Sequence, residues 1–170
     1  MLYLTVLFLA LLRLLLLVGG QETPQTCPSS LQDRRCSCAR NESSDSSSYL
    51  VRCLPSFIVA GTQKSGTTVL AAYLSGHPSL VLSHRKEVHF FDRTRNFIKG
   101  IHRYLMAFPY VNFSTETTST LPLFGEATPF YLASESACRR ISQTLSNTKI
   151  LVLLREPIAR AYSEYQMKKR

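Results

Sequence analysis

The chain has 170 residues, which leaves room for one modest domain and an N-terminal appendage and is too short for several domains. Hydrophobic residues make up 45% of the sequence and aromatic residues 10%, enough for a packed core from about residue 54 onward. The formal net charge of +9 favours polyanionic partners. Composition alone leaves nucleic acid, an acidic polysaccharide and a phosphorylated nucleotide as alternatives.

The first segment, 1–20, is almost wholly apolar but is interrupted by Arg13, and it is short for a membrane-spanning helix. Small residues close it at Gly19 and Gly20, where a signal peptidase would cut, and the chain turns polar at Gln21. We therefore expect a cleaved signal peptide, with an uncleaved signal anchor as the alternative. In both cases the rest of the chain is expected in the lumen of the secretory pathway, Golgi or secreted, with membrane contact only through this segment.

Residues 21–53 are rich in Pro, Gln, Ser and Cys, and a serine tract at 43–48 buries little surface, so we interpret this segment as a stem. The composition changes at residue 54, and 54–170 is predicted to be the N-terminal part of a folded domain. Two glycosylation sequons begin at Asn41 and Asn112, which is compatible with a lumenal glycoprotein.

Four of the five cysteines crowd into the stem at Cys27, Cys36, Cys38 and Cys53. In an oxidising compartment they predict local disulfides, whose connectivity the sequence leaves open. Their spacing lacks the paired CxxC units of a zinc site. Cys138 stands alone, either as a buried free thiol or with a partner in sequence beyond this chain.

Beyond the stem, short apolar runs alternate with segments of helical character. The predicted strands are 57–60, 80–82 and 149–154, and the predicted helices are 67–75, 94–106, 135–145 and 158–169. The last strand, KILVLL, is a near-continuous apolar run, a pattern typical of a strand covered on both faces. The alternation predicts an α/β three-layer sandwich with a mainly parallel sheet. Because the sequence stops inside the last predicted helix, we expect an incomplete domain, a truncated isoform or an incomplete gene model.

A loop with the sequence GTQKSGTT, at 61–68, joins the first predicted strand to the first predicted helix. Glycines allow a tight turn in which successive N–H groups converge, and the helix N-terminus adds positive potential. Lys64 adds a mobile charge, and Thr67 and Thr68 add hydroxyl donors. The pattern predicts a cradle for an anion, with an ordinary turn between strand and helix as the alternative.

This loop departs from the G-x-x-x-x-G-K-[ST] pattern of ATPases. Gly61 and Gly66 have the ATPase spacing, but Thr67 occupies the lysine position and Lys64 lies inside the loop. An ATPase needs that lysine on the β- and γ-phosphates. The charge is therefore displaced toward the 5′-phosphate of a shorter donor, which argues against a P-loop kinase.

A second phosphate pattern follows the last predicted strand. Arg155 lies at the carboxyl end of that strand, where ligands bind in open α/β sheets, and Ser163 lies on the next helix. A guanidinium suits a phosphate better than an ammonium does. The alternative is that Arg155 is a salt-bridge partner, but together with the first loop a phosphate ligand is favoured.

The two patterns together resemble those of carbohydrate sulfotransferases that use 3′-phosphoadenosine-5′-phosphosulfate (PAPS). GTQKSGTT is similar to their 5′-phosphosulfate-binding motif and LREPIARAYSEY to their 3′-phosphate-binding motif, and the likeness spans 56–170. It implies PAPS as co-substrate and a fold like that of P-loop-containing nucleoside triphosphate hydrolases. By the resemblance, the 5′ end would be held by Lys64, Ser65, Gly66, Thr67 and Thr68, and the 3′-phosphate by Arg155 and Ser163.

A third stretch, RKEVHFFD at 85–92, resembles the heparan sulfate glucosaminyl N- and 3-O-sulfotransferases. The resemblance implies that Glu87 is the catalytic base that takes the acceptor proton. Lys64 would stabilise the charge that grows on the leaving phosphate, and His89 would assist on the acceptor side. The alternative is that Glu87 and His89 belong to a surface ion cluster beside Lys86.

The resemblance implies sulfuryl transfer to a hydroxyl or amino group of a carbohydrate that resembles a glycosaminoglycan, with no nucleic acid partner and no metal. A further segment, GEATPFY at 125–131, is similar to one that lines the cleft in this family, although heparan-modifying members commonly have a lysine at Ala127. The remaining alternatives are a non-catalytic nucleotide-binding fragment, a P-loop kinase and a basic polysaccharide-binding protein.

Overall fold

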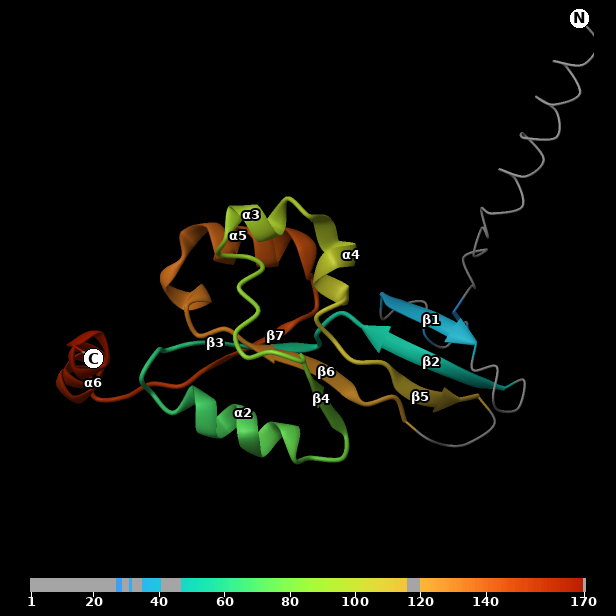
Figure 1. Ribbon diagram of the computed structural model, residues 1–170, viewed down its shortest axis with the longest axis horizontal. Helices are drawn as coiled ribbons and strands as arrows, with labels where there is room; N and C mark the ends of the chain where they lie inside the picture. Colours follow the sequence, from blue (N-terminus) through green and yellow to red (C-terminus); the bar gives the residue numbers. More distant parts are fainter. Residues whose placement is uncertain (1–26, 29–30, 32–34, 41–46, 116–119, 170) are drawn as a thin grey trace, which may run out of the picture.

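In the described part of the chain, the larger of two sheets has four parallel strands in the order β4-β6-β3-β7 (Figure 1). Its members are β3 (Phe57–Gly61), β4 (Leu80–Leu82), β6 (Leu123–Ala127) and β7 (Lys149–Val152). The structure, a computed structural model, describes residues 27–28, 31, 35–40, 47–115 and 120–169. The predicted N-terminal segment 1–20 and the sequon at Asn41 lie outside these residues.

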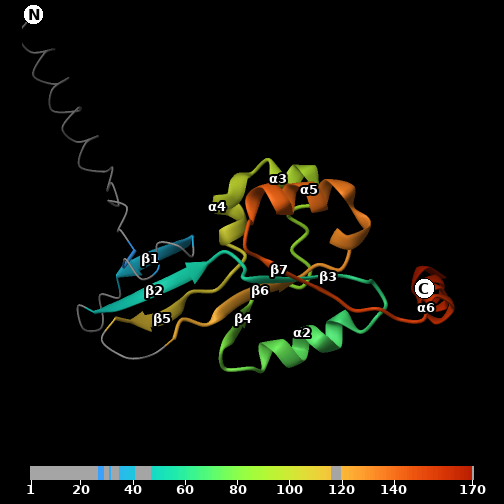
Figure 2. The ribbon, with the colours of Figure 1, turned by 180° about the vertical axis from the view of Figure 1, so that it is seen from behind.

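Helices cover both faces of this sheet, as Figures 1 and 2 show from opposite sides. Helix α2 (Thr67–Ser75) lies on one face, and α3 (Thr94–Phe97), α4 (Gly100–Leu105) and α5 (Glu135–Thr144) lie on the other. Helix α6 (Pro157–Lys169) lies beyond the end of the sheet. The predicted α/β three-layer architecture with a mainly parallel sheet is therefore confirmed.

Parallel pairing places the functional loops at one edge of the sheet. β3 pairs with β6 from Phe57↔Gly125 onward and with β7 from Phe57↔Lys149 onward, so the three strands run in register. The predicted phosphate loop follows β3, and Arg155 follows β7. Because parallel strands have their carboxyl ends at the same edge, both segments start from one side of the sheet.

Most predicted elements match the structure closely, but two differ. The helix predicted over 94–106 is divided into α3 and α4, because Gly100 has φ +81 and does not continue a right-handed helix. The prediction that 149–154 is covered on both faces was wrong. All four residues of β7 are exposed, because β7 ends the strand order and pairs only with β3 among the described strands.

The smaller sheet is antiparallel and joins the predicted stem to the domain. It consists of β1 (Cys36–Arg40), β2 (Ser48–Cys53) and β5 (Val111–Ser114), in that order. Val51 of β2 is fully buried, and Leu31 is 2% exposed within the same core. The boundary at residue 53 stays a prediction, yet the strands before it share the core of the domain.

Two disulfides tie the smaller sheet together. Cys27 bonds to Cys38 and Cys36 bonds to Cys53, which confirms the predicted local disulfides and supplies their connectivity. Cys138 is a free thiol but is exposed, so the alternative of a buried thiol was wrong. Among the described residues, no helix is both long enough and apolar enough to cross a membrane.

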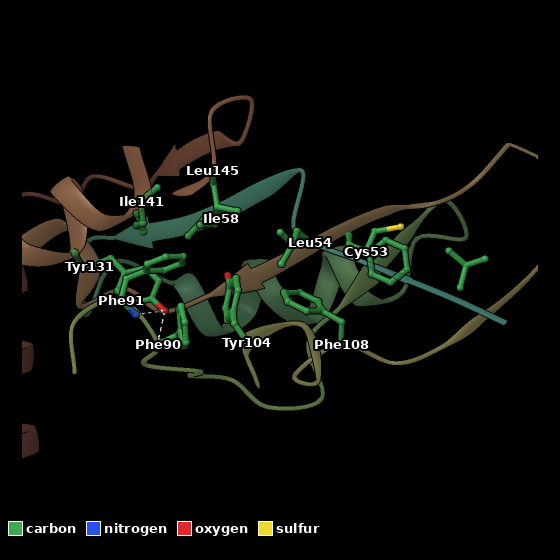
Figure 3. Close-up of a cluster of buried hydrophobic side chains, with 14 of the residues drawn as sticks. Cys53, Leu54, Ile58, Phe90, Phe91, Tyr104, Phe108, Tyr131, Ile141 and Leu145 are labelled. Atoms are coloured by element: carbon green, nitrogen blue, oxygen red, sulfur yellow. Dashed lines mark hydrogen bonds between the residues drawn. The ribbon is translucent and has the colours of Figure 1, made fainter. Parts of the chain in front are cut away.

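An aromatic cluster fills the core between the sheet and α4 (Figure 3). The ring of Phe90 stacks on that of Tyr104 at a centroid distance of 4.5 Å, and Phe91 meets Tyr104 edge-on at 5.0 Å. Phe91 also contacts Tyr131, from the short 3₁₀ helix η2 (Tyr131–Ala133), at 5.7 Å. These rings fix the segment around Phe90 and Phe91 to the centre of the molecule.

Gly125 of β6 is required by close packing rather than by its backbone angles. A Cβ atom built on it would lie 2.1 Å from the ring of Phe57, which is 7% exposed and has little room to move. At Gly76, which ends α2, a Cβ atom would approach nothing closer than the carbonyl oxygen of Tyr73 at 3.5 Å.

Substitution at these two glycines should therefore have different effects on stability. Gly125→Ala is expected to lower the free energy of unfolding by about 1–3 kcal/mol, because the ring of Phe57 must shift in a packed core. Gly76→Ala is the matched control and should change it by less than about 0.5 kcal/mol. Urea unfolding measures both, and equal effects would contradict the packing argument.

Candidate active site

The phosphate loop turns sharply between β3 and α2. Lys64 has φ +70 and Gly66 has φ +89, both in the left-handed region, and α2 begins directly after Gly66. A non-glycine residue at such an angle is uncommon and is held by its surroundings. The loop is fixed from the side of β7, since the amide of Thr62 donates to the carbonyl of Leu153 at 3.0 Å.

The hydroxyl of Ser65 is a buried polar group in this loop. Its Oγ is shielded from solvent and has no hydrogen-bond partner within the described residues. Buried polar atoms are nearly always satisfied, so an unpartnered one beside a helix N-terminus fits an anion that carries oxygen atoms. The residues of the loop therefore fit a phosphate or sulfate group.

The segment after β7 reaches the same loop. Nη1 of Arg155 donates to the carbonyl oxygen of Lys64 at 3.0 Å. Glu156 caps helix α6 by accepting from the amides of Ile158 at 2.9 Å and Ala159 at 2.6 Å, and these two bonds lower the pKa of its carboxyl. The cap fixes the start of the helix that carries Ser163.

A cavity of 320 Å³ brings together residues from all three predicted motifs, and we call it the donor cavity. Its lining includes Lys64, Gly66, Thr67 and Thr68 of the phosphate loop, together with Glu87, Pro129 and Ser163. Ser65 and Arg155 do not line it, although Arg155 bonds to its loop. Segments that are far apart in sequence, from Gln63 to Met167, thus enclose one space.

Glu87 and His89 lie in a short chain of ionisable side chains. Oε2 of Glu87 is 3.1 Å from Nε2 of His89, whose Nδ1 is 2.7 Å from Oδ2 of Asp92. Lys86 contacts the other oxygen of Glu87 at 3.3 Å. The side chain of Asp92 is only 4% exposed, so it fixes one ring nitrogen of His89 and leaves the other facing Glu87.

A larger cleft of 550 Å³ opens on the other side of Glu87, and we call it the basic cleft. The basic side chains that line it are His84, Arg85, His89, Arg93, Lys99 and Arg103. Glu87 lines both the basic cleft and the donor cavity, and among the described residues it is the one acidic residue in the lining of either.

The core next to the segment of Glu87 and His89 contains a buried carboxylate. Glu126 of β6 is fully buried and accepts hydrogen bonds from the hydroxyls of Tyr104, Thr128 at 2.8 Å and Tyr131 at 3.1 Å. Burial raises the pKa of Glu126 to about 7, although the three hydrogen bonds act in the opposite direction. The same burial, with the nearby carboxylate, raises the pKa of Tyr104 and Tyr131.

Sequence reasoning missed two of these residues. Asp92 follows His89 by three positions, and only the turn at His89 brings the two side chains together. Glu126 was interpreted as part of a cleft-lining segment, but it is buried in the core. An acidic residue inside the apolar strand LFGEA was the available signal. Ala127, the departure from the family pattern, is buried against Val59 and Ala71.

In sequence, this chain is similar to known proteins. The sulfotransferase domain model matches residues 54–170. The chain is 40% identical over 114 residues to the membrane-associated sulfotransferase kil1 of Dictyostelium discoideum. The aligned region covers 66% of this chain and 23% of that protein. It is 38% identical over 116 residues to heparan sulfate glucosamine 3-O-sulfotransferase 5 of Mus musculus, covering 68% of this chain and 31% of that protein.

A solved sulfotransferase from Alicyclobacillus acidocaldarius superposes with a TM-score of 0.53 at 27% identity, covering 69% of this chain and 51% of that one. The match confirms the predicted P-loop-like fold. The chain therefore belongs to the sulfotransferase domain family. It spans less than a third of the length of the two curated relatives named above.

The raised pKa of Glu126 predicts how stability depends on pH. Between the ordinary value of 4.5 and about 7, the folded chain keeps a proton on Glu126 that the unfolded chain has released. The free energy of unfolding should therefore fall across this window as pH rises, by about 3 kcal/mol for this group. Urea unfolding at several pH values measures the slope.

Glu126→Gln should remove this part of the slope, because the amide does not titrate. Glu135→Gln is the matched control, since the side chain of Glu135 is 86% exposed and pairs with Arg139 on the helix surface. An unchanged slope in Glu126→Gln would show that this carboxyl does not titrate in the window.

Proposed function

We propose that this chain carries the donor site and the catalytic base of a sulfotransferase that moves a sulfuryl group from PAPS to a carbohydrate hydroxyl or amino group. The observation that carries the proposal is the position of Glu87, which lines both the donor cavity and the basic cleft. A base at this junction can act on an acceptor atom in the basic cleft while the donor lies in the cavity.

The donor would be held at both of its ends. Lys64, the hydroxyls of Ser65, Thr67 and Thr68, and the amides around Gly66 would bind the 5′-phosphosulfate, and Arg155 with Ser163 the 3′-phosphate. The hydroxyl of Ser65, which is unpartnered among the described residues, and the loop's convergence on the N-terminus of α2 support this assignment. PAPS supplies the sulfuryl group, and Lys64 offsets the charge that develops on the leaving phosphate.

On the acceptor side, the carboxylate of Glu87 takes the proton as the acceptor oxygen or nitrogen bonds to sulfur and the bond from sulfur to the phosphate oxygen breaks. His89 contacts Glu87 through one ring nitrogen while Asp92 contacts the other, which keeps the base oriented. We assign Glu87, Lys64 and His89 as catalytic residues on this basis.

The acceptor is proposed to be an anionic polysaccharide of the glycosaminoglycan type. The lining of the basic cleft includes the cationic side chains of Arg85, Arg93, Lys99 and Arg103. Such a surface favours a chain that already carries carboxylate or sulfate groups. The name of the Mus musculus relative, a heparan sulfate sulfotransferase, agrees with this class of acceptor.

We further propose that the protein works in the secretory pathway, in the Golgi lumen. The two disulfides suit an oxidising compartment, and the sequon residue Asn112 is exposed on β5, where a glycan could attach. The predicted signal at 1–20 would deliver the chain there. These features support a glycoprotein that is either secreted or anchored by that segment.

Donor binding is tested with adenosine 3′,5′-bisphosphate, the product that PAPS leaves after transfer. Lys64→Ala and Arg155→Ala should each weaken its binding to the full-length protein by about 10-fold or more, because each removes a charged contact with phosphate. Arg139→Ala is the matched control on α5 and should bind as the wild type does. Calorimetry gives the affinities, and unchanged binding in both site variants would refute the PAPS assignment.

The role of Glu87 is tested separately. Glu87→Gln should bind adenosine 3′,5′-bisphosphate normally but lose about 100-fold or more in kcat for sulfate transfer to a glycosaminoglycan, since the amide does not accept the proton. Transfer of labelled sulfate measures kcat. Persistent transfer would contradict the assignment of Glu87, whereas donor binding without transfer in the wild type would favour a nucleotide-binding protein that is not catalytic.

A further inference from the structure

The segment that carries Glu87 and His89 belongs to no helix or strand, yet its amides are held by side chains. The amides of Val88 and His89 donate to Oγ1 of Thr128, at 3.0 and 3.4 Å. The amides of the next two residues, Phe90 and Phe91, donate to the hydroxyl oxygen of Tyr131, at 2.9 and 3.4 Å, as Figure 3 shows for this pair. Two hydroxyl groups thus accept from four consecutive amides.

Glu126 determines which way these two hydroxyls point. A hydroxyl has one hydrogen to donate and lone pairs with which to accept. Thr128 donates its hydrogen to Oε2 of Glu126 at 2.8 Å, and Tyr131 donates to Oε1 at 3.1 Å. With both hydrogens directed at the buried carboxylate, the lone pairs of both oxygens face the amides.

The carbonyl groups of the same segment are also fixed. Nδ2 of Asn96, on α3, donates to the carbonyl oxygen of His89 at 2.8 Å, and Nη1 of Arg140, on α5, donates to that of Phe91 at 2.8 Å. His89 itself has φ +53, a left-handed angle that a residue with a side chain seldom adopts. Contacts on both sides of the backbone hold this uncommon conformation.

We propose that Glu126 is a positioning residue, which acts through Thr128 and Tyr131 to hold the backbone of residues 88–91 and thereby aims Glu87 and His89 at the reacting atoms. The inference rests on the proposed function, because it takes Glu87 as the base. Glu126, Thr128 and Tyr131 line neither the donor cavity nor the basic cleft as the described residues form them. They act only by fixing the backbone that carries the reacting side chains.

The first test is hydrogen exchange of the full-length protein at pH 8. Thr128→Val keeps the shape of the side chain but loses the acceptor, so the amides of Val88 and His89 should exchange about 10-fold faster or more, as expected for the loss of a hydrogen bond. Thr128→Ser keeps the hydroxyl and should restore protection. If the amides of Val88 and His89 exchange as fast in Thr128→Ser as in Thr128→Val, the proposal is overturned, because the methyl group would then be the part of the side chain that protects them.

Glu126→Gln tests the orienting role of the carboxylate. An amide offers one acceptor oxygen where the carboxylate offers two, so one hydroxyl should turn its lone pair toward the new NH₂ group. Exchange should then rise at one pair of amides, either Val88 with His89 or Phe90 with Phe91. Unchanged protection at both pairs would show that Glu126 does not orient the hydroxyls.

Kinetics distinguish positioning from general support of the fold. Thr128→Val should lower kcat for transfer by about 10- to 100-fold, while the affinity for adenosine 3′,5′-bisphosphate and the KM for the donor stay at wild-type values. Thr128→Ser should recover kcat. A wild-type kcat in Thr128→Val, with its amides exchanging freely, would overturn the proposal. If the wild type binds the donor product but transfers no sulfate, the proposed function fails, and the exchange experiments still decide whether Glu126 holds the segment.

Discussion

The parallel alignment of β6, β3 and β7 is the constraint on which the candidate site depends. Parallel strands carry their carboxyl ends to the same edge, so the segments that follow all three begin side by side. The phosphate loop follows β3, Pro129 follows β6 and Arg155 follows β7. An antiparallel neighbour would have sent one of these segments to the opposite end of the sheet. The hydrogen bond from Arg155 to Lys64 is a direct result of this geometry.

The site also depends on a segment that itself belongs to no strand or helix. The chain from Glu87 to Asp92 begins at the residue that lines both the donor cavity and the basic cleft. Its shape comes from the side chain of Thr128, just after β6, and from side chains of η2, α3 and α5. Aromatic packing of Phe90 and Phe91 supplies the apolar part of this support, and the hydroxyls of Thr128 and Tyr131 supply the polar part. The segment that carries the candidate site residues is therefore also part of the hydrophobic core.

Local sequence patterns made the phosphate loop and the helix after it predictable. The glycine and hydroxyl residues of 61–68 specify a turn before a helix, so both the loop and α2 could be placed from the sequence. The resemblance supplied Glu87 and His89. The buried surroundings of Glu126 were not predictable, because they combine residues of β6, α4 and η2 that meet only in the folded chain. Asp92 was missed because its contact depends on the left-handed turn at His89.

Long-range pairing set the other limit on prediction. The smaller sheet pairs Ser48 with Ser114, residues far apart in sequence. No alternation of apolar and polar residues in the stem indicated its strands. Four clustered cysteines allow three connectivities, and only the register of β1 against β2, in which Cys36 faces Cys53, selects among them. The exposure of β7 was equally hidden, since an apolar run looks alike whether it lies within a sheet or at its edge.

That exposed strand has a consequence for how the chain behaves at high concentration. β7 pairs on one side only among the described strands, and Ile150, Leu151 and Val152 are each more than a third exposed. Nearby, Leu154 and Ile158 are 84% and 79% exposed. An open strand edge flanked by apolar side chains invites intermolecular strand addition. The colloidal stability of this chain in isolation is therefore limited at β7, only a few residues before Arg155 in the sequence.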